Sequence, residues 1–476
     1  MISELFSAGG WLNNAIMQVS DFLWTYILIA ALIGCGIYFS WRLRFAQFRM
    51  LREMFRLLGD SAAKGTSHHK HVSSFQAFAV SVATRVGTGN LAGVATAIAI
   101  GGPGAVFWMW VIAIIGAASA FVESTLAQLF KRRDGHSFIG GPAYYILHGL
   151  HCRWMAALFA VLISITFGLS YNSIQSNTIC SAMNQAFGWN EWIVGAVLAV
   201  TALFIVFGGI HRIARISSVL VPIMAIGYFI LALFIVLINI SQLPHIIALI
   251  VKSAFGFGQF AGGAIGMTMM TGIKRGLFSN EAGEGSAPNV AATAHVSHPV
   301  KQGLVQTLSV FTDTLLVCSC TAFIILISGL YETSELNGII LTQSALQSEV
   351  GNVGPIFVAI AIFLFAFSSI IGNYYYGEAN IRFLTQKKWV LNVFRVLAGG
   401  VVVMFGAIAS LDLVWNLGDV CMALITACNL IAITMLGKYA FTLLNDYREQ
   451  KRRGVAEPTF HRDQLPTLSR DIDCWE

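Results

Sequence analysis

Two short stretches combine an arginine with glycines and uncharged polar side chains inside otherwise apolar segments. The first is RVGTGNLAG, residues 85–93, within the apolar run from Phe75 to Ile100. The second is RGLFSNEAGEGSAPN, residues 275–289, which repeats the pattern Arg-x4-Asn-x-Ala-Gly. Such glycines favour unwinding of a helix, and unwound backbone at membrane depth must find partners for its amides and carbonyls. A bound ligand is one such partner.

The chemistry of the two stretches suits a small zwitterion together with a hard cation. A half-helix N-terminus presents free N–H groups to a carboxylate, and the carbonyls of the preceding half suit sodium or an ammonium group. Further uncharged oxygens come from Thr88, Asn90, Ser279 and Asn280. Gly87 and Gly89 leave room only for a small ligand. Simple packing of helices through glycine would not explain the matched arginines and asparagines.

The composition places these stretches in a membrane protein. Of 476 residues, 56% are hydrophobic and 11% are charged, and the mean hydropathy is +0.72. A soluble domain has about a quarter charged residues. No polar segment is long enough for a separate catalytic domain, and no basic-aromatic groove for nucleic acid is present. Neither a nucleophile–base constellation nor a GxxxxGK[ST] loop occurs, which argues against an intramembrane enzyme and an ATP-driven pump.

Windows of about 20 apolar residues predict an all-α membrane protein with eleven transmembrane helices. The expected spans are 21–40, 74–100, 104–130, 154–186, 192–209, 216–240, 259–295, 302–330, 353–382, 389–409 and 413–440. The two unusual stretches fall in spans two and seven, which cross the membrane in opposite directions. This arrangement predicts a 5+5 inverted repeat with two broken helices.

The expected organisation is one transmembrane transporter domain over residues 1–440. It contains an extra first helix (21–40), repeat one (about 74–240) and repeat two (about 259–440), and a cytoplasmic tail (441–476) follows. Basic residues set the orientation, because all but four of the 29 Lys and Arg residues fall on one side if the C-terminus is cytoplasmic. We therefore expect the N-terminus outside and the C-terminus inside.

Several long motifs resemble those of the alanine or glycine:cation symporter family of prokaryotes. They are RVGTGNLAGVATAI, GGPGAVFWMW, GGPAYYI and KRGLFSNEAGEGSAPNVAATA, and the resemblance extends from about Phe75 to Asp419. It implies a leucine-transporter-like fold in the bacterial cytoplasmic membrane. It also implies sodium-coupled uptake of small neutral amino acids such as alanine or glycine, and it gives no indication of oligomeric state.

The same resemblance implies positions for the two ligands. Sodium would bind the carbonyls of Ala83 and Val86 and the hydroxyls of Ser368 and Ser369, although adjacent hydroxyls in an apolar helix usually bond their own preceding carbonyls. The remaining implied residues bind or surround the substrate: Thr88, Gly89 and Asn90 for its carboxylate, and Gln175, Phe278, Ser279 and Asn280 for the rest of the pocket.

One residue departs from the family pattern. Many members have tryptophan where this chain has Asn373. An amide in place of a large apolar lid opens the pocket and makes it more polar, so serine, threonine or glutamine become alternatives to alanine and glycine.

Intramembrane charges leave a second coupling mechanism open. Arg85 and Arg275 need counter-charges, and the available acids are Glu281, Glu284, Asp313, Glu123 and Glu378. We expect Arg85 to pair with Glu281 or Asp313, because buried charges generally persist in pairs. The pair could fix the two broken helices together, or act as a gate or proton-coupled site. The alternative to sodium symport is thus a proton-coupled symporter or an exchanger.

Overall fold

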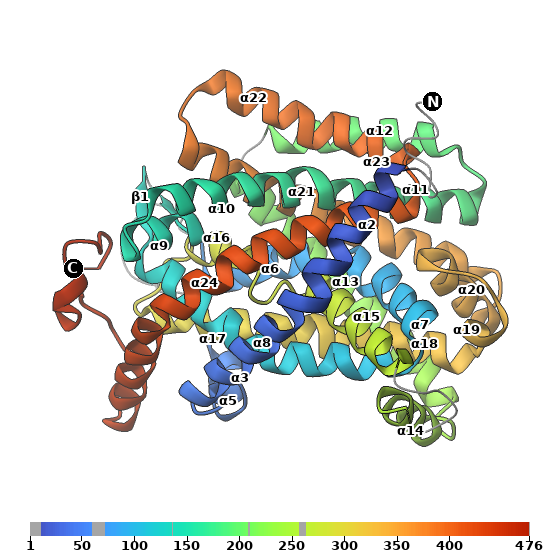
Figure 1. Cartoon of the computed structure of the whole chain (residues 1–476), viewed down its shortest axis with the longest axis horizontal. Coiled ribbons are helices and arrows are strands. Elements are labelled where there is room, and N and C mark those ends of the chain that lie inside the picture. The colour runs from blue at the N-terminus through green and yellow to red at the C-terminus, as the bar shows by residue number, and fades with distance from the viewer. Residues whose placement is uncertain (1–10, 60–71, 136, 208–209, 257–262, 476) are drawn as a thin grey trace.

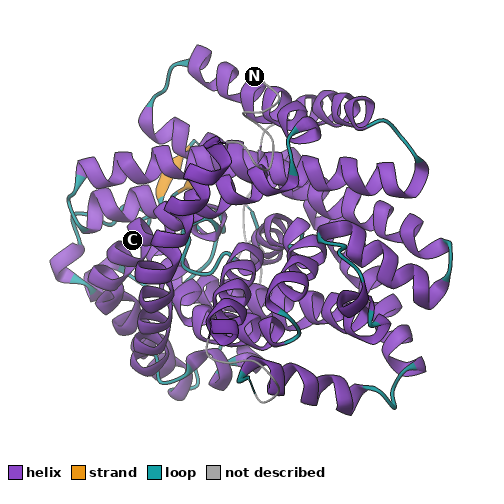
Figure 2. Cartoon of the chain, turned by 45° about the vertical axis from the view of Figure 1, so that its right-hand side comes forward, coloured by secondary structure: helices purple, strands orange, loops and turns teal. Residues whose placement is uncertain are grey.

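The computed structural model describes residues 11–59, 72–135, 137–207, 210–256 and 263–475. Within these ranges the chain is almost entirely helical, as Figure 2 shows. The exception is a short antiparallel hairpin of β1 (Arg132–Asp134) and β2 (Ser137–Ile139). The predicted all-α class is therefore confirmed for the described part of the chain.

Helices of the first half begin and end as follows: α2 Trp11–Leu23, η1 Trp24–Leu28, α3 Ile29–Arg42, α4 Ala46–Arg49, α5 Leu51–Leu58, α6 Ser74–Arg85, η3 Gly89–Gly93, α7 Val94–Gly101, α8 Gly104–Leu129, α9 Pro142–Gly149, α10 Arg153–Ile165, η4 Thr166–Tyr171, α11 Asn172–Phe187, α12 Glu191–Val206, α13 Ile210–Ile238 and α14 Leu243–Ala254. Those of the second half are α15 Gly263–Asn280, α16 Ala287–Ala291, α17 Pro299–Val310, η5 Phe311–Cys318, α18 Ser319–Ser328, α19 Leu330–Thr333, α20 Gly338–Val350, α21 Val353–Leu384, α22 Lys388–Val396, η6 Leu397–Val401, α23 Val402–Ile408 and α24 Leu411–Arg452. The η elements in both lists are π-helical turns, and most of them continue a longer helix.

Seven helices in the described ranges are long and apolar enough to cross a membrane, or eight if a pair bent by 103° counts as one span. The bent pair is 226–238 with 243–254. The predicted count of eleven stays a prediction, since the other expected spans lie in α6–α7, α12, α13 and α15–α16. Breaks divide two of these: α6 and α7 have 12 and 8 residues, and α15 and α16 have 18 and 5. Residues 208–209 and 259–262, which close or open predicted spans, lie outside the described residues.

The first span is longer than expected. The helical run continues from Trp11 to Arg42, whereas the apolar window begins only at residue 21. Its first part contains polar residues such as Asn13, whose Oδ1 accepts from Asn416 Nδ2 on α24 at 2.8 Å. Packing against α24 stabilises a polar turn that hydropathy alone excludes.

The connecting elements gather at the two ends of the bundle. In Figure 1 the hairpin, α9 and the C-terminal tail lie at the left end, and α14, α19 and α20 lie at the right end. Between them, glycines let helices approach closely. A Cβ at Gly276 of α15 would lie 3.2 Å from the Met109 Cα of α8, and one at Gly303 of α17 would lie 2.9 Å from the Phe121 carbonyl. The second broken helix, through α15, and helix α17 therefore both pack directly against α8.

Candidate functional site

The first helix breaks at the predicted glycines. Helix α6 begins with a capping box between Ser73 and Gln76, and it ends at Arg85, after which Val86 takes the non-helical dihedrals φ −75° and ψ 90°. Asn90 Oδ1 then accepts from the Gly87 amide at 2.9 Å, in the manner of a helix cap. Helical structure resumes at residue 89.

The second helix breaks between Asn280 and Ala287. Three of the intervening residues have positive φ: Glu281 (53°), Gly283 (94°) and Gly285 (85°). The two glycines adopt this conformation without strain, whereas a left-handed glutamate is uncommon. The segment is buried, and Asn280 Oδ1 accepts from the Ala282 amide at 3.0 Å. Both predicted breaks are thus present.

The two breaks meet at one place. A Cβ at Gly89 would lie 3.0 Å from Ser279 Cα and 3.1 Å from Phe278 Cδ1. Asp313, from the π-helical turn η5, joins the breaks because its carboxylate accepts from Asn90 Nδ2 at 2.7 Å and from Ser279 Oγ at 2.8 Å. A fully buried carboxylate with only neutral donors is a suitable ligand for a monovalent cation.

The amide of Gln175 on α11 closes another side of the first break. Its Oε1 accepts from the Thr88 amide at 3.0 Å and from Thr88 Oγ1 at 2.7 Å. Gly87 lies against the same amide, and a Cβ there would lie 2.9 Å from Gln175 Oε1. Both donors of Thr88 therefore point toward one acceptor, whereas Asn90 Nδ2 points toward Asp313, and the expected carboxylate site stays a prediction.

The paired serines of α21 face the same break from the other side. Ser369 Oγ donates to the Ala83 carbonyl at 2.9 Å, and Ser368 Oγ lies 3.3 Å from it. Both hydroxyls also bond the Phe365 carbonyl of their own helix, at 2.8 and 3.1 Å. The two hydroxyls therefore bond their own helix and also converge on Ala83. Two hydroxyls beside a buried carbonyl at a helix end fit a sodium ion.

Two buried amides near the breaks lack partners. Neither Nδ2 nor Oδ1 of Asn373 has a hydrogen-bond partner among the described residues, although the side chain is only 1% exposed. Asn280 Nδ2 is likewise unpaired. An unpaired buried polar group costs about 1–3 kcal/mol. Asn373 lies on α21 one turn beyond Ser369 and one turn before Tyr376, whose hydroxyl is 3.0 Å from Thr84 Oγ1 of α6.

Arg85 does not form the expected ion pair in this structure. Its Nη1 donates to Ser309, and its Nε and Nη2 have no partner in the described part of the chain. Glu281 accepts from Ser286 at 2.5 Å instead, and neutral donors occupy both oxygens of Asp313. Arg85 remains in a site with several buried acids, so a gating role stays a prediction.

Sequence reasoning missed the acid that pairs with the second arginine. Asp419 of α24 accepts from Arg275 Nη2 at 2.8 Å and lies 3.5 Å from Lys274 Nζ. The acids considered from the sequence did not include it, and Glu378 pairs with Arg382 and Arg395 instead. A carboxylate within the apolar last span was the available signal. Arg275 also lies over the ring of Trp415, 4.2 Å from its centroid.

Replacing Asp419 by asparagine is expected to destabilise the folded protein more than to alter its selectivity. The change leaves the buried Arg275 guanidinium with a neutral acceptor in place of its carboxylate, whereas Lys274 retains Asp21 at 3.8 Å. Removing one partner of a buried pair costs about 3–5 kcal/mol. Thermal unfolding of the purified variant in detergent tests this. Asp412→Asn, in the first turn of the same helix, is the control, and equal melting temperatures for the two variants would contradict the expectation.

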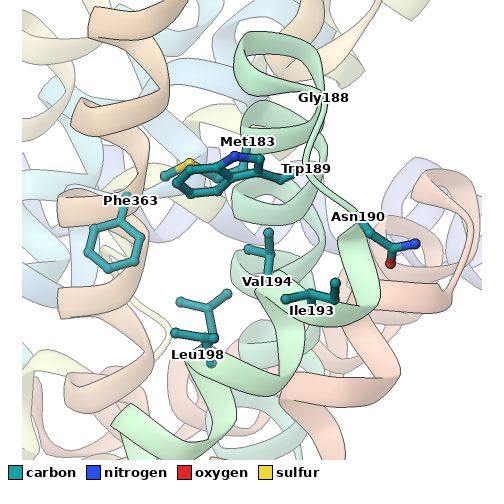
Figure 3. A pocket seen from close by; sticks show the side chains of 9 residues that line it. Met183, Gly188, Trp189, Asn190, Ile193, Val194, Leu198 and Phe363 are labelled. Carbon is teal, nitrogen blue, oxygen red and sulfur yellow. The ribbon is translucent and has the colours of Figure 1, made fainter.

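The apolar pocket in Figure 3 lies apart from the breaks. It has a volume of about 510 Å³ and is open to the surface between the α11–α12 connection and α21. Its lining includes Met183, Gly188, Trp189, Asn190, Ile193, Val194, Val197, Leu198 and Phe363. Among these residues only Asn190 and Trp189 carry a polar side-chain group, so this pocket is unsuited to a zwitterion. The candidate site is therefore the junction of the breaks.

Known proteins resemble this chain over nearly its whole length. The model of the sodium:alanine symporter family matches residues 10–462. A probable sodium/glutamine symporter of Bacillus subtilis is 52% identical over 98% of this chain and 96% of its own length. An amino-acid carrier protein of the same organism is 51% identical over 98% of each chain. A sodium/alanine symporter of Methanococcus maripaludis is 36% identical over 89% of this chain and 94% of its own.

Proposed function

Because this chain belongs to the sodium:alanine symporter family, we propose that it carries a small neutral amino acid into the cell together with sodium by alternating access. It is a membrane transporter and not an enzyme. Alanine and glycine are the proposed substrates, in a bacterial inner membrane with the C-terminus in the cytoplasm. The observation that carries the proposal is the meeting of two broken helices around Gly89, Ser279 and Asp313.

In this proposal the substrate carboxylate takes the place of the Gln175 amide oxygen at Thr88. The Thr88 amide and hydroxyl already donate to that oxygen, and Gly89 and Asn90 complete the turn at the new helix start. Phe278, Ser279 and Asn280 cover the substrate from the second break, and the close approach at Gly89 limits its size.

Sodium would bind between Ala83, Val86, Ser368 and Ser369. The two hydroxyls turn from the carbonyls toward the ion, which needs only a rotation about χ1. Sodium would then tie α21 to the end of α6, and the first broken helix would be held in one position while the ion is bound. Coupling between ion and substrate follows, because both ligands order the same break.

Uptake into proteoliposomes tests the proposal directly. Radiolabelled alanine uptake is expected to need an inward sodium gradient and to fail when choline replaces sodium. Uptake driven by a proton gradient and indifferent to sodium would support the proton-coupled alternative. Competition by unlabelled glycine, serine and glutamine would rank the substrates.

Asn373 makes a larger or more polar substrate the second candidate. Its unpaired amide is available to a hydroxyl or amide on the substrate side chain, and one relative carries the name of a glutamine symporter. In Asn373→Leu we expect competition by glutamine and serine to weaken roughly five-fold relative to alanine, because one hydrogen bond is worth about 1 kcal/mol. Unchanged competition by glutamine and serine would show that Asn373 does not contact the substrate.

The melting temperature distinguishes a substrate-binding role of Asn373 from a structural role. Asn373→Leu should keep or raise the melting temperature, since no protein hydrogen bond is lost. Asn380→Leu on the same helix is the matched control. Its Nδ2 bonds Asn289 Oδ1 and the Tyr376 carbonyl, both at 2.9 Å, so it should lower the melting temperature.

A further inference from the structure

The segment after α24 folds back onto the protein. Gly454, with φ 80°, ends the helix, and residues 455–475 then run along the end of the bundle that contains the hairpin, at the left of Figure 1. Five of its apolar side chains are buried, namely Phe460, Leu465, Leu468, Ile472 and Trp475, whereas Val455 at its start is 39% exposed. A tail without a docking surface would leave such residues in water. We call residues 455–475 the C-terminal strap.

The strap covers two internal segments. Trp475 Nε1 donates to the Gln128 carbonyl at the end of α8 at 3.0 Å, and its ring lies 4.5 Å from Lys131 Nζ. The Phe460 amide donates to the Ser297 carbonyl at 2.9 Å, in the segment between α16 and α17. The strap therefore contacts both α8 and the chain that leaves the second broken helix.

The covered residues also hold the two broken helices together. Gln128 Nε2 and Lys131 Nζ donate to the Ala294 carbonyl at 2.9 and 3.3 Å. The next residue, His295, donates its amide to the Val72 carbonyl at 3.0 Å, two residues before α6 begins. One connected set of contacts thus joins the strap, the segment that follows the second broken helix and the segment that precedes the first.

For the candidate site to open toward the end of the bundle that the strap covers, this set of contacts must break. The broken helices line the candidate site, so a ligand leaves toward the C-terminal end only when residues 72–74 separate from residues 292–298. Lys131 is 2% exposed and sits between the rings of Phe138 and Trp475, with its Nζ 4.2 Å from the Phe138 centroid. Withdrawal of Trp475 would hydrate this ammonium group and free its bond to Ala294, because cations are strongly favoured in water.

We propose that the C-terminal strap is a latch that holds the two broken helices closed at the cytoplasmic end, and that Trp475 must leave its site before this end opens. The inference rests on the proposed transport cycle and adds a regulatory step to it. The strap follows Gly454, whose φ is 80°, and its polar contacts to α8 and residues 294–298 come from the Trp475 indole, the Pro458 carbonyl and the Phe460 amide. It could therefore release as a unit without unfolding α24.

A native thiol reports the opening. Cys318 is 3% exposed, and its Sγ lies 3.1 Å from Ser279 Oγ and 3.3 Å from Asn90 Nδ2. A membrane-impermeant methanethiosulfonate reagent reaches this sulfur only when the candidate site is open to the treated face. The extent of modification of the Cys318 peptide is read by mass spectrometry in sealed vesicles of each orientation. The readout needs neither sodium nor amino acid, so it stands apart from the uptake experiment.

We expect loss of the Trp475 side chain to change Cys318 modification from one membrane face only. Trp475→Ala should speed Cys318 modification roughly ten-fold from the C-terminal face and leave the other face unchanged, as a shift of about 1.4 kcal/mol in the closed state requires. Arg470→Ala, an exposed strap residue, should behave as wild type, and Trp475→Phe should fall between. Unchanged modification, or equal acceleration from both faces, would overturn the latch, since the second outcome indicates general loosening of the fold.

Discussion

Replacing Ser368 and Ser369 together by alanine is expected to abolish sodium-driven uptake while the protein remains folded. Each hydroxyl lies within 3.3 Å of the Ala83 carbonyl, at the proposed ion position. An oxygen bonded to a charged group contributes about 1.5–3 kcal/mol. Loss of two such oxygens should raise the sodium concentration for half-maximal uptake roughly 100-fold or more.

The folded state should tolerate this change, because the hydroxyls give up bonds to carbonyls that already belong to helices. Ser164→Ala on α10 is the matched control, since that buried hydroxyl bonds its own preceding carbonyl of Ala160 at 2.7 Å and lies outside the candidate site. Sodium titrations of alanine uptake distinguish the variants. Equal sodium dependence in the double variant and in wild type would place the ion elsewhere, with Asp313 as the next candidate.

The sequence predicted the breaks because glycine and proline act locally. The positions at which α6 and α15 stop follow from Gly87, Gly89, Gly283 and Pro288, whose effects need no knowledge of neighbouring helices. The contacts across the breaks are tertiary. The pairing of Arg275 with Asp419 depends on how α24 lies against α15, and no spacing rule connects residues 144 positions apart.

Other departures have the same origin. The first helix begins ten residues before its apolar window because α24 supplies partners for its polar turn. The apolar residues of the strap are spaced irregularly and match neither helix nor strand periodicity, so they do not predict that it folds back onto the bundle. The cytoplasmic location expected for residues 441–476 stays a prediction. The local residue pattern therefore predicts where helices start and stop. Packing against other parts of the fold determines which polar or irregular segments are stabilised.

The difference between local pattern and tertiary contacts also explains why the candidate residues converge on the first break. Each break exposes backbone groups that its own helix no longer satisfies. In this fold the first break takes partners from α11 and α21, through Gln175 and Ser369, and from η5 through Asp313. These partners are neutral or acidic side chains that a substrate or ion can displace, so the broken helices are held by contacts that binding can exchange.

Gly89→Ala is expected to remove substrate binding almost completely. The added methyl carbon would lie 3.0 Å from Ser279 Cα and 3.1 Å from the Phe278 ring, closer than such contacts normally occur. The obstacle is backbone of the second broken helix, which cannot rotate aside as a side chain would. The two breaks must then move apart, and overpacking of this kind costs about 1–3 kcal/mol.

Gly93→Ala separates this steric effect from a general effect of alanine in the helix. Gly93 lies one turn further along, and its added methyl would lie 3.6 Å from Trp415, an ordinary contact. We expect Gly93→Ala to retain most uptake. For Gly89→Ala we expect uptake to fall at least roughly 100-fold, since displacement of positioning groups by about 1 Å has effects of this size. Thermal stabilisation by sodium plus alanine measures binding independently of transport. If Gly89→Ala were stabilised as strongly as wild type, the junction of the two breaks would not be the substrate site.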